Sequence, residues 1–314
     1  MSPSPLKPSP APGVAMVGID WGTTHRRCYR LGRAGSLQAE HADDLGLLAA
    51  GGPGWFRAAL DSALAAWPDL PGDAPVLMSG MVGSAQGWHA VPYLGLETPL
   101  SAMGEHLFAL PDGPAGRRCA IVPGYAMRLA DGTLDVMRGE ETQLLGALGL
   151  GDGLGDGWVV LPGTHSKWVR LRGGCIERFA TFMTGELFGL LSQHGTLAPL
   201  MAQGRDSPPA FERGLRAAAG GSLSNLLFGV RARVVAGAMP AAEARDQVSG
   251  LLVGAEWHAA LQREGGAIER VSVIGVPALA ERHRQAGALL GVAVDLIDPR
   301  RAYVAALARL QSFL

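Results

Sequence analysis

Lysine is nearly absent from this chain. Of its 27 basic residues only Lys7 and Lys167 are lysines, so arginine carries almost all of the positive charge. Charged residues make up 18% of the 314 positions, and the formal net charge is −1. Proteins that bind nucleic acid neutralise many phosphates with a surplus of positive charge. The lack of such a surplus argues against a nucleic-acid partner.

Cysteine is equally scarce. The chain has three cysteines, far apart and without a CxxC pair: Cys28, Cys119 and Cys175. An odd and sparse set argues against a disulfide framework and against a cysteine-based zinc site. Free, buried thiols in a cytoplasmic protein are the simplest interpretation.

Targeting and membrane signals are missing as well. Residues 1–13 (MSPSPLKPSPAPG) are rich in proline and serine and lack the apolar core of a signal peptide, which predicts a disordered tail. No later segment has the roughly 18 uninterrupted apolar residues of a membrane helix. Because 48% of the residues are hydrophobic, we expect a globular cytoplasmic protein with no membrane partner.

Strand and helix patterns alternate along the chain, which predicts the α/β class. Short apolar runs typical of buried strands stand at 14–19, 74–78, 120–123, 158–161, 271–275 and 292–297. Apolar residues recur at helical spacing in 53–67, 139–150, 187–191, 211–219, 223–238, 241–261, 277–290 and 299–314. The Gly- and Asp-rich stretch 149–157 is the best candidate for a linker, so we expect two domains at 14–150 and 151–314.

The two halves share one pattern: an apolar strand, a turn containing Gly-Thr, a polar cluster and a return strand. The first copy reads Asp20-Trp21-Gly22-Thr23-Thr24, and the second reads Gly163-Thr164-His165-Ser166-Lys167. Small residues in such turns let backbone N–H groups approach phosphate oxygens, and an aspartate at a strand end suits Mg²⁺. A single Gly-Thr turn is more often an ordinary hairpin. Neither a Walker A loop nor a GxGxxG loop is present, which disfavours P-loop kinases and Rossmann dehydrogenases.

An acidic pair, Glu140 and Glu141, opens the predicted helix between these turns. Phosphoryl transfer to an alcohol needs a carboxylate that accepts the hydroxyl proton. Acids in a first helical turn also serve as plain capping groups. Their position between the two turns favours the catalytic interpretation.

Candidate substrate groups are cationic or rich in amides and small side chains. Arg26, Arg138 and Lys167 are candidates for binding a carboxylate or phosphates, although most arginines are simply solvated. The segment 79–88 (SGMVGSAQGW) is typical of a sugar-binding loop, with a plain glycine-rich connection as the alternative. The substrate-binding candidates are Arg26, Ser79, Gly80, Met81, Gln86, Trp88 and Arg138.

These motifs together resemble a known family. The segments 18–29 (GIDWGTTHRRCY) and 161–169 (LPGTHSKWV) resemble the two phosphate motifs of the actin/hexokinase-like ATPases. Four further segments resemble the 2-dehydro-3-deoxygalactonokinase family within that group. They are 79–88 (SGMVGSAQGW), 136–148 (VMRGEETQLLGAL), 162–168 (PGTHSKW) and 179–188 (FATFMTGELF).

The resemblance implies two ribonuclease H-like domains with an active-site cleft between them, and it implies ATP and Mg²⁺. The implied reaction is phosphorylation of the 6-hydroxyl of 2-dehydro-3-deoxy-D-galactonate in galactonate catabolism. By motif position Asp20 would serve the metal, and Glu141 or Glu140 would replace the catalytic aspartate of the wider group. The positions matched to nucleotide binding are Gly22, Thr23, Thr24, Gly163, Thr164, His165, Ser166, Lys167 and Gly275. At the last of these, Pro277 and Ala278 depart from the small turn residues expected after it.

Two alternatives stay open at this point. In the first, the chain is a kinase for a different sugar acid, such as 2-dehydro-3-deoxygluconate. In the second, it is a nucleotide-gated sugar sensor of the same fold, which binds ATP and the sugar without phosphate transfer. A substrate panel separates these hypotheses. The sequence leaves open whether the protein forms a homo-oligomer.

Overall fold

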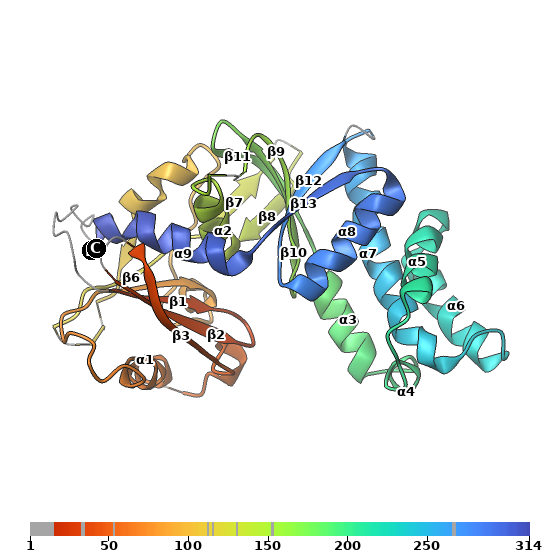
Figure 1. Ribbon diagram of the computed structural model, residues 1–314, viewed down its shortest axis with the longest axis horizontal. Coiled ribbons are helices and arrows are strands. Elements are labelled where there is room, and N and C mark those ends of the chain that lie inside the picture. The colour runs from red at the N-terminus through yellow and green to blue at the C-terminus, as the bar shows by residue number, and fades with distance from the viewer. Residues whose placement is uncertain are drawn as a thin grey trace. The chain divides into compact units, whose positions relative to one another are not determined.

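The computed structural model describes residues 16–314 except 33–34, 53, 112, 115, 130, 152–153 and 266–267 (Figure 1). The predicted tail at 1–13 therefore lies outside the described residues. The chain forms two compact units. Unit 1 comprises Met1–Asp156, Leu171–Phe179 and Pro299–Leu314, and unit 2 comprises Gly157–Arg170 and Ala180–Asp298. This division differs from the expected domains because two later segments belong to unit 1.

Unit 1 is built on a six-stranded sheet with the order β3-β2-β1-β4-β6-β5. Its strands are β1 (Met16–Trp21), β2 (Arg26–Leu31), β3 (Leu37–Asp43), β4 (Val76–Gly80), β5 (Phe108–Ala109) and β6 (Cys119–Ile121). Strands β1, β4 and β6 are parallel to one another, whereas β2 and β3 form an antiparallel meander beside β1. A separate hairpin joins β7 (Tyr125–Arg128) and β8 (Leu134–Met137).

Helices cover both faces of this sheet (Figure 1). They are α1 (Trp55–Ala65), α2 (Glu140–Ala147) and α9 (Pro299–Leu310), with 3₁₀ turns η2 (Leu47–Ala49), η3 (Met81–Gly83), η4 (Leu100–His106) and η7 (Gln311–Phe313). Along β1, Ile19 and Trp21 join the hydrophobic cluster under α1. Gly18 alternates to the opposite face, where a Cβ would lie 2.2 Å from the side chain of Leu307 on α9. Asp20 shares this α9 face.

The last helix returns to unit 1 because it packs closely against α2. A Cβ on Gly146 of α2 would lie 1.7 Å from the carbonyl oxygen of Ala302 on α9. Only glycine allows the two backbones to approach this far. The C-terminal segment is therefore part of the core that supports α2.

Unit 2 is centred on a five-stranded sheet with the order β11-β10-β9-β12-β13. The strands are β9 (Gly157–Leu161), β10 (Ser166–Arg172), β11 (Cys175–Phe182), β12 (Arg270–Ile274) and β13 (Ala293–Ile297), and the last residues of β10 and the first of β11 belong to unit 1. Strand β12 is parallel to both β9 and β13. When these five strands are numbered by their order along the chain, they lie side by side as third-second-first-fourth-fifth. Unit 1 shows the same order in β3-β2-β1-β4-β6, with the short strand β5 added at the edge. The shared order confirms the internal repeat predicted from the sequence.

The helices of unit 2 are α3 (Thr184–Gln193), α4 (Ala198–Met201), α5 (Pro208–Ala217), α6 (Leu223–Val235), α7 (Ala244–Arg263) and α8 (Pro277–Leu290), with the turns η5 (Ala218–Gly220) and η6 (Ala241–Glu243). Helix α7 contributes to two hydrophobic clusters, one with the sheet and one with α4 and α6. It crosses α5 at glycines, since a Cβ on Gly250 would lie 2.0 Å from the oxygen of Phe211. Within the described ranges, no helix is long and apolar enough to cross a membrane.

The α/β class predicted from the alternating pattern is confirmed. Several strands were not predicted, namely β3, β5, β7, β8 and β11. Strand β3 lies at the sheet edge and its residues alternate between exposed and half-buried positions, so it lacks the apolar run that marked the central strands.

Candidate active site

Asp20 lies near the carboxyl end of β1, on the face that α9 covers. It is in register with Arg27 on β2 and with Ser79 on β4. An Arg27 Nη1 atom lies 3.3 Å from its Oδ2 atom, and the carboxylate side chain is 17% exposed. Burial raises the pKa of Asp20, and the charge of Arg27 only partly offsets this effect. The site therefore favours a further positive charge next to this carboxylate.

A single carboxylate of this kind fits Mg²⁺ bound together with a nucleotide. Mg²⁺ usually takes one or two protein carboxylates and completes its shell with phosphate oxygens and water. Among the described residues, no group of three acidic, histidine or cysteine side chains forms a metal cage. Asp20 thus suits the expected metal role, and its partner ligands would come from the substrate.

The turn after β1 is packed firmly against the segment that follows β3. The Gly22 N–H donates to the oxygen of His25 at 2.9 Å, and the Leu48 N–H donates to the oxygen of Thr23 at 2.9 Å. A Cβ on Gly46 would lie 2.4 Å from the carbonyl carbon of Thr24. The turn is thus held by its backbone, while Thr23 is half-buried and Thr24 is exposed.

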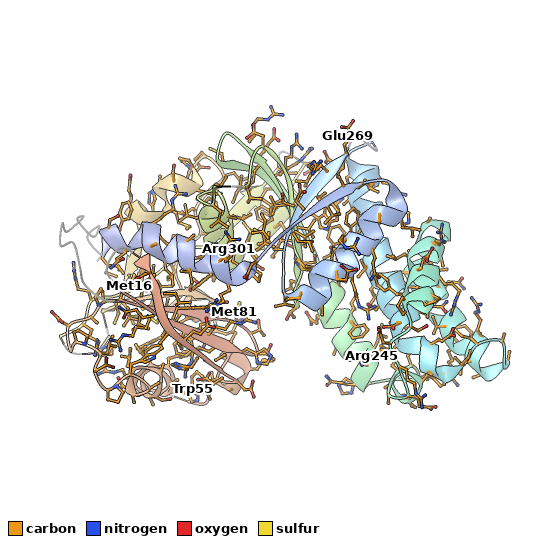
Figure 2. The ribbon with its side chains drawn as sticks, in the orientation of Figure 1. Met16, Trp55, Met81, Arg245, Glu269 and Arg301 are labelled. Carbon is orange, nitrogen blue, oxygen red and sulfur yellow. The ribbon has the colours of Figure 1, made fainter. Side chains whose placement is uncertain are left out.

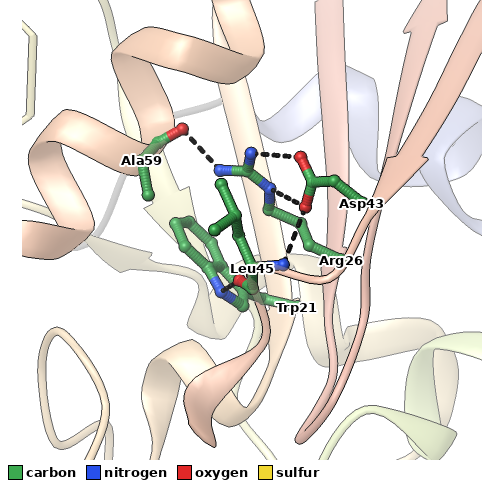
Figure 3. A network of polar contacts seen from close by, with 5 residues as sticks. All are labelled: Trp21, Arg26, Asp43, Leu45 and Ala59. Carbon is green, nitrogen blue, oxygen red and sulfur yellow. Dashed lines mark hydrogen bonds and ion pairs between the residues drawn. The ribbon is translucent and has the colours of Figure 1, made fainter. Parts of the chain in front are cut away.

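The structure gives Arg26 a different role from the expected one (Figure 3). Its side chain is fully buried, and Nε and Nη2 donate to the two oxygens of Asp43 at 3.2 and 2.6 Å. Nη1 donates to the oxygen of Ala59 on α1, and the guanidinium lies 5.1 Å from the ring centre of Trp21. Leu45 completes the network, because its oxygen accepts from Trp21 Nε1 and its N–H donates to Asp43. Arg26 therefore stabilises unit 1, and its donors are not directed at a ligand.

Glu141 lies in the first turn of α2 and is fully buried. Its Oε2 accepts the N–H of Gly139 at 2.6 Å, and its Oε1 accepts the hydroxyl of Thr142 at 3.1 Å. Burial, followed by the charge of Glu140, raises the pKa of Glu141 to about 8. A carboxyl group whose pKa lies near neutrality is able to accept and release a proton during a reaction.

The start of α2 lies against the end of β4. A Cβ on Gly139 would lie 3.3 Å from the Cα of Gly80, and both glycines have positive φ angles, 111° and 86°. Since β1 and β4 are parallel, their carboxyl ends meet at one edge of the sheet. This edge therefore gathers Asp20, Ser79 and Glu141.

Tyr303 on α9 is a residue of this edge that the sequence did not single out. Its hydroxyl forms a hydrogen bond of 2.8 Å with Ser79 Oγ, and both side chains are buried. Burial raises the pKa of Tyr303 well above its usual value, and the charge of Asp20 adds to the effect. The sequence held no signal for it, because Tyr303 is 224 positions from Ser79 in the chain.

The other predicted residues of the 79–88 loop differ in exposure. Met81, which is labelled in Figure 2, opens η3 directly after β4, and Gln86 is exposed. Trp88 packs against the core of unit 1, with its ring stacked 6.3 Å from that of Phe56. Packing thus explains Trp88, while Met81 and Gln86 keep their predicted substrate role as a hypothesis.

In unit 2, the start of α3 lies against the second Gly-Thr turn. A Cβ on Gly185 would lie 2.2 Å from the oxygen of Gly163, and the Glu186 N–H donates to the oxygen of Thr164 at 2.9 Å. His165 Nε2 lies 2.6 Å from Glu186 Oε2. A helix N-terminus and exposed backbone at a turn are suited to binding phosphate.

Gly275 lies beside the strand end that leads into this turn. It follows β12, whose carboxyl end is next to that of β9 because the two strands are parallel. A Cβ on Gly275 would lie 2.8 Å from Pro162 Cγ. Unit 2 thus brings together the turn after β9, the start of α3 and the turn before α8.

Two predicted nucleotide-binding residues point into unit 2. Lys167 is buried and its Nζ donates to Thr181 Oγ1 at 2.8 Å. Ser166 is buried and donates to Glu256 Oε1 at 2.6 Å. The structure therefore offers no support for direct contact of these two side chains with a nucleotide.

Glu256 on α7 is a second residue that sequence reasoning missed. It is 2% exposed and accepts hydrogen bonds from Ser166, Trp168 and Thr184, which lie on or next to β10 and α3. An acid inside the apolar helix 251–261 (LLVGAEWHAAL) was the available signal. Because Thr184 precedes Gly185, this network holds the start of α3, which packs on the second Gly-Thr turn.

Comparison with known proteins agrees with these observations. The family model described as 2-keto-3-deoxy-galactonokinase matches residues 20–310. A probable 2-dehydro-3-deoxygalactonokinase of Rhizobium meliloti is 38% identical over 93% of this chain and 94% of its own length. The 2-dehydro-3-deoxygalactonokinase of Escherichia coli is 34% identical over 92% of this chain and 94% of its own length.

A solved structure extends the agreement to three dimensions. The crystal structure of a provisionally named 2-dehydro-3-deoxygalactonokinase protein from Sinorhizobium meliloti matches with a TM-score of 0.86 and 36% identity. The match covers 94% of this chain and 95% of that one. The family model and the relatives both span nearly the whole chain, and the chain belongs to the 2-keto-3-deoxygalactonokinase family.

Proposed function

We propose that this protein transfers the γ-phosphoryl group of ATP to the 6-hydroxyl of 2-dehydro-3-deoxy-D-galactonate, in the cytoplasm. The family match over residues 20–310 supports the reaction class and the substrate. The observation that carries the proposal is the position of Glu141, a carboxyl group buried at the start of α2 and packed against the end of β4, at the sheet edge that also holds Asp20.

In the proposed reaction, the backbone N–H groups of Thr23 and Thr24, and those of Gly163 and Thr164, bind phosphate oxygens, while the Gly22 N–H stays bonded to His25 and holds the first turn. Asp20 would hold Mg²⁺, and the bound ion would neutralise charge on the phosphates. The 6-hydroxyl oxygen attacks the γ-phosphorus, the bond from phosphorus to the ADP oxygen breaks, and Glu141 accepts the hydroxyl proton. Tyr303 and Ser79 fix the sheet edge next to the metal-binding carboxylate.

A coupled ADP-release assay tests the activity. The acceptors are 2-dehydro-3-deoxygalactonate, 2-dehydro-3-deoxygluconate, galactonate, gluconate and glycerol, each with and without Mg²⁺. Preference for the first acceptor supports the proposal. Preference for another sugar acid would keep the kinase and replace its substrate, whereas ATP binding without turnover of any acceptor would favour a sensor.

Two matched variants test the proposed base. Glu141→Gln should lower kcat by about 100- to 10,000-fold, the usual contribution of general-base catalysis, with the Kd for ATP unchanged within about twofold. Glu140→Gln is the control, since Glu140 is its neighbour in the same helical turn. Loss of turnover in Glu140→Gln together with retained turnover in Glu141→Gln would assign the base to Glu140 instead.

A further inference from the structure

Unpartnered polar atoms are found in the loop that follows β4 and on Arg138, which packs against this loop at Gly83. Ser84 Oγ, His89 Nδ1, and both Nε and Nη1 of Arg138 are buried and have no hydrogen-bond partner among the described residues. Buried polar groups in native proteins are nearly always paired, so each exception marks a ligand, a water or another missing partner. Four such atoms in one part of unit 1 indicate a binding site.

Arg138 is held rigidly at this place. Its Nη2 donates to the oxygen of Val91 at 2.6 Å, and its guanidinium carbon lies 4.2 Å from the ring centre of Tyr93. The Val91 N–H in turn donates to the oxygen of Gly83 at 3.0 Å. A Cβ on Gly83 would lie 2.9 Å from Arg138 Nη1, so glycine provides the space that the guanidinium occupies.

The charge of Arg138 has no carboxylate partner among the described residues. This contrasts with Arg26, whose guanidinium is fully engaged by Asp43 and Ala59. Arg138 as a whole is half-buried, but its Nε and Nη1 atoms are buried without a partner. Leaving such donors unpaired is unfavourable, and a bound anion would supply the missing acceptors. Planar guanidinium groups are well suited to carboxylates, since they present several N–H donors in one plane.

We propose that Arg138 binds the carboxylate of the sugar-acid substrate, with the hydroxyl of Ser84, the residue after the Gly83 that packs on the guanidinium. This inference rests on the proposed function. The substrate carries its carboxylate at C1 and the reacting hydroxyl at C6, so separate groups of the protein must hold the two ends. Gly139, the residue after Arg138, donates its N–H to Glu141 Oε2 at 2.6 Å, which places the binding site next to the proposed base.

The decisive experiment compares the acid with its methyl ester in the wild type and in Arg138→Gln. In the wild type, kcat/KM for the ester should be about 100-fold lower than kcat/KM for the acid, the typical effect of losing one member of a buried charge pair. Arg138→Gln should lower kcat/KM for the acid by a similar factor, and the ester should cause almost no further loss in this variant. If Arg138 had a purely structural role, Arg138→Gln would reduce kcat/KM for the acid and for the ester by the same factor.

Three controls keep the outcome clear. Arg117→Gln removes an arginine of the same unit that donates to two backbone oxygens, Pro71 and Ala74, and should not change the acid-to-ester ratio. Arg138→Lys should recover part of the preference for the acid because it keeps the charge. If Arg138→Gln fails to fold, Gly83→Ala displaces Nη1 without removing the charge and should reduce the same ratio.

Direct binding separates this inference from the proposed function. Calorimetry with the acid, in the presence of a non-hydrolysable ATP analogue, should show affinity in the wild type and a loss of about 100-fold in Arg138→Gln. Binding that depends on Arg138 without turnover would overturn the proposed reaction alone. Equal losses of kcat/KM for acid and ester in Arg138→Gln would overturn the role of Arg138. A loss of affinity for the nucleotide alone would also overturn it and would assign Arg138 to phosphate binding. No binding of the acid to the wild type would overturn both.

Discussion

The ionisation of Glu141 predicts that Glu141→Gln becomes more stable, relative to the wild type, as the pH rises. The ordinary pKa of a glutamate is 4.5, and burial raises that of Glu141 to about 8. A group whose pKa is raised by folding contributes stability that is complete below the unfolded pKa and is lost as the pH rises through the folded pKa. The wild type should therefore lose stability between about pH 4.5 and pH 8 through this group.

The size of the effect follows from the shift. At about 1.4 kcal/mol for each pKa unit, the difference from 4.5 to about 8 corresponds to roughly 5 kcal/mol, and about 4 kcal/mol of it falls between pH 5 and pH 9. The charges around the carboxyl are those of Glu140, which raises its pKa, and Arg138, which lowers it. The Glu141→Gln variant lacks this ionisation, and its loss of one acceptor for Gly139 or Thr142 is independent of pH and cancels in the comparison.

Urea unfolding followed by circular dichroism at pH 5 and pH 9 measures this difference. The free energy of unfolding of Glu141→Gln minus that of the wild type should increase by up to about 4 kcal/mol between the two pH values. Glu281→Gln is the control, because Arg284 and Gln285 lower the pKa of Glu281 to about 2 and this group stays ionised from pH 5 to 9. A difference that is constant within about 0.5 kcal/mol would refute the reasoning from burial.

Further predictions concern packing and the two buried networks. Gly146→Ala places a Cβ against the backbone of Ala302 and should destabilise the protein by about 2 kcal/mol or more. Gly189→Ala, in an open position on α3, should stabilise it by about 0.5–1 kcal/mol. Thermal unfolding of both variants checks this, and equal effects would contradict the close packing of α2 on α9. Glu256→Gln should raise the KM for ATP by several-fold more than that for the sugar acid, because it loosens the start of α3; unchanged nucleotide kinetics would exclude this positioning role. Arg26→Gln should lower the free energy of unfolding by about 3 kcal/mol by leaving Asp43 without its partner, and unchanged stability with a raised KM for the sugar acid would return Arg26 to the substrate site.

Much of the fold was predictable from local patterns. Apolar runs marked the central strands because those strands are buried on both faces, and helical spacing marked α8 over the range 277–290. Edge strands escaped prediction for the opposite reason. Strand β3 has one solvated face and few apolar residues, so its sequence resembles a loop.

Arg26 and Arg27 show what the sequence alone does not predict, namely the face of the sheet on which each side chain lies. The sequence suggested Arg26 as a ligand, but strand alternation turns it toward α1, opposite Trp21, where Asp43 and Ala59 engage it. Its neighbour Arg27 is the residue that lies beside Asp20. Because side chains alternate with a period of two, a shift of one residue moves a group to the other face of the sheet.

The sequence by itself determined the α/β class, the repeated Gly-Thr turns, the acidic pair at 140–141 and the family, because each depends on residues close together in the chain. Only the tertiary structure decided which groups share an environment. The Ser79–Tyr303 contact, the burial that raises the pKa of Glu141, and the donors around Glu256 join segments that are far apart in sequence. Electrostatic free energies depend on distance and burial in three dimensions, so linear order carries no record of them.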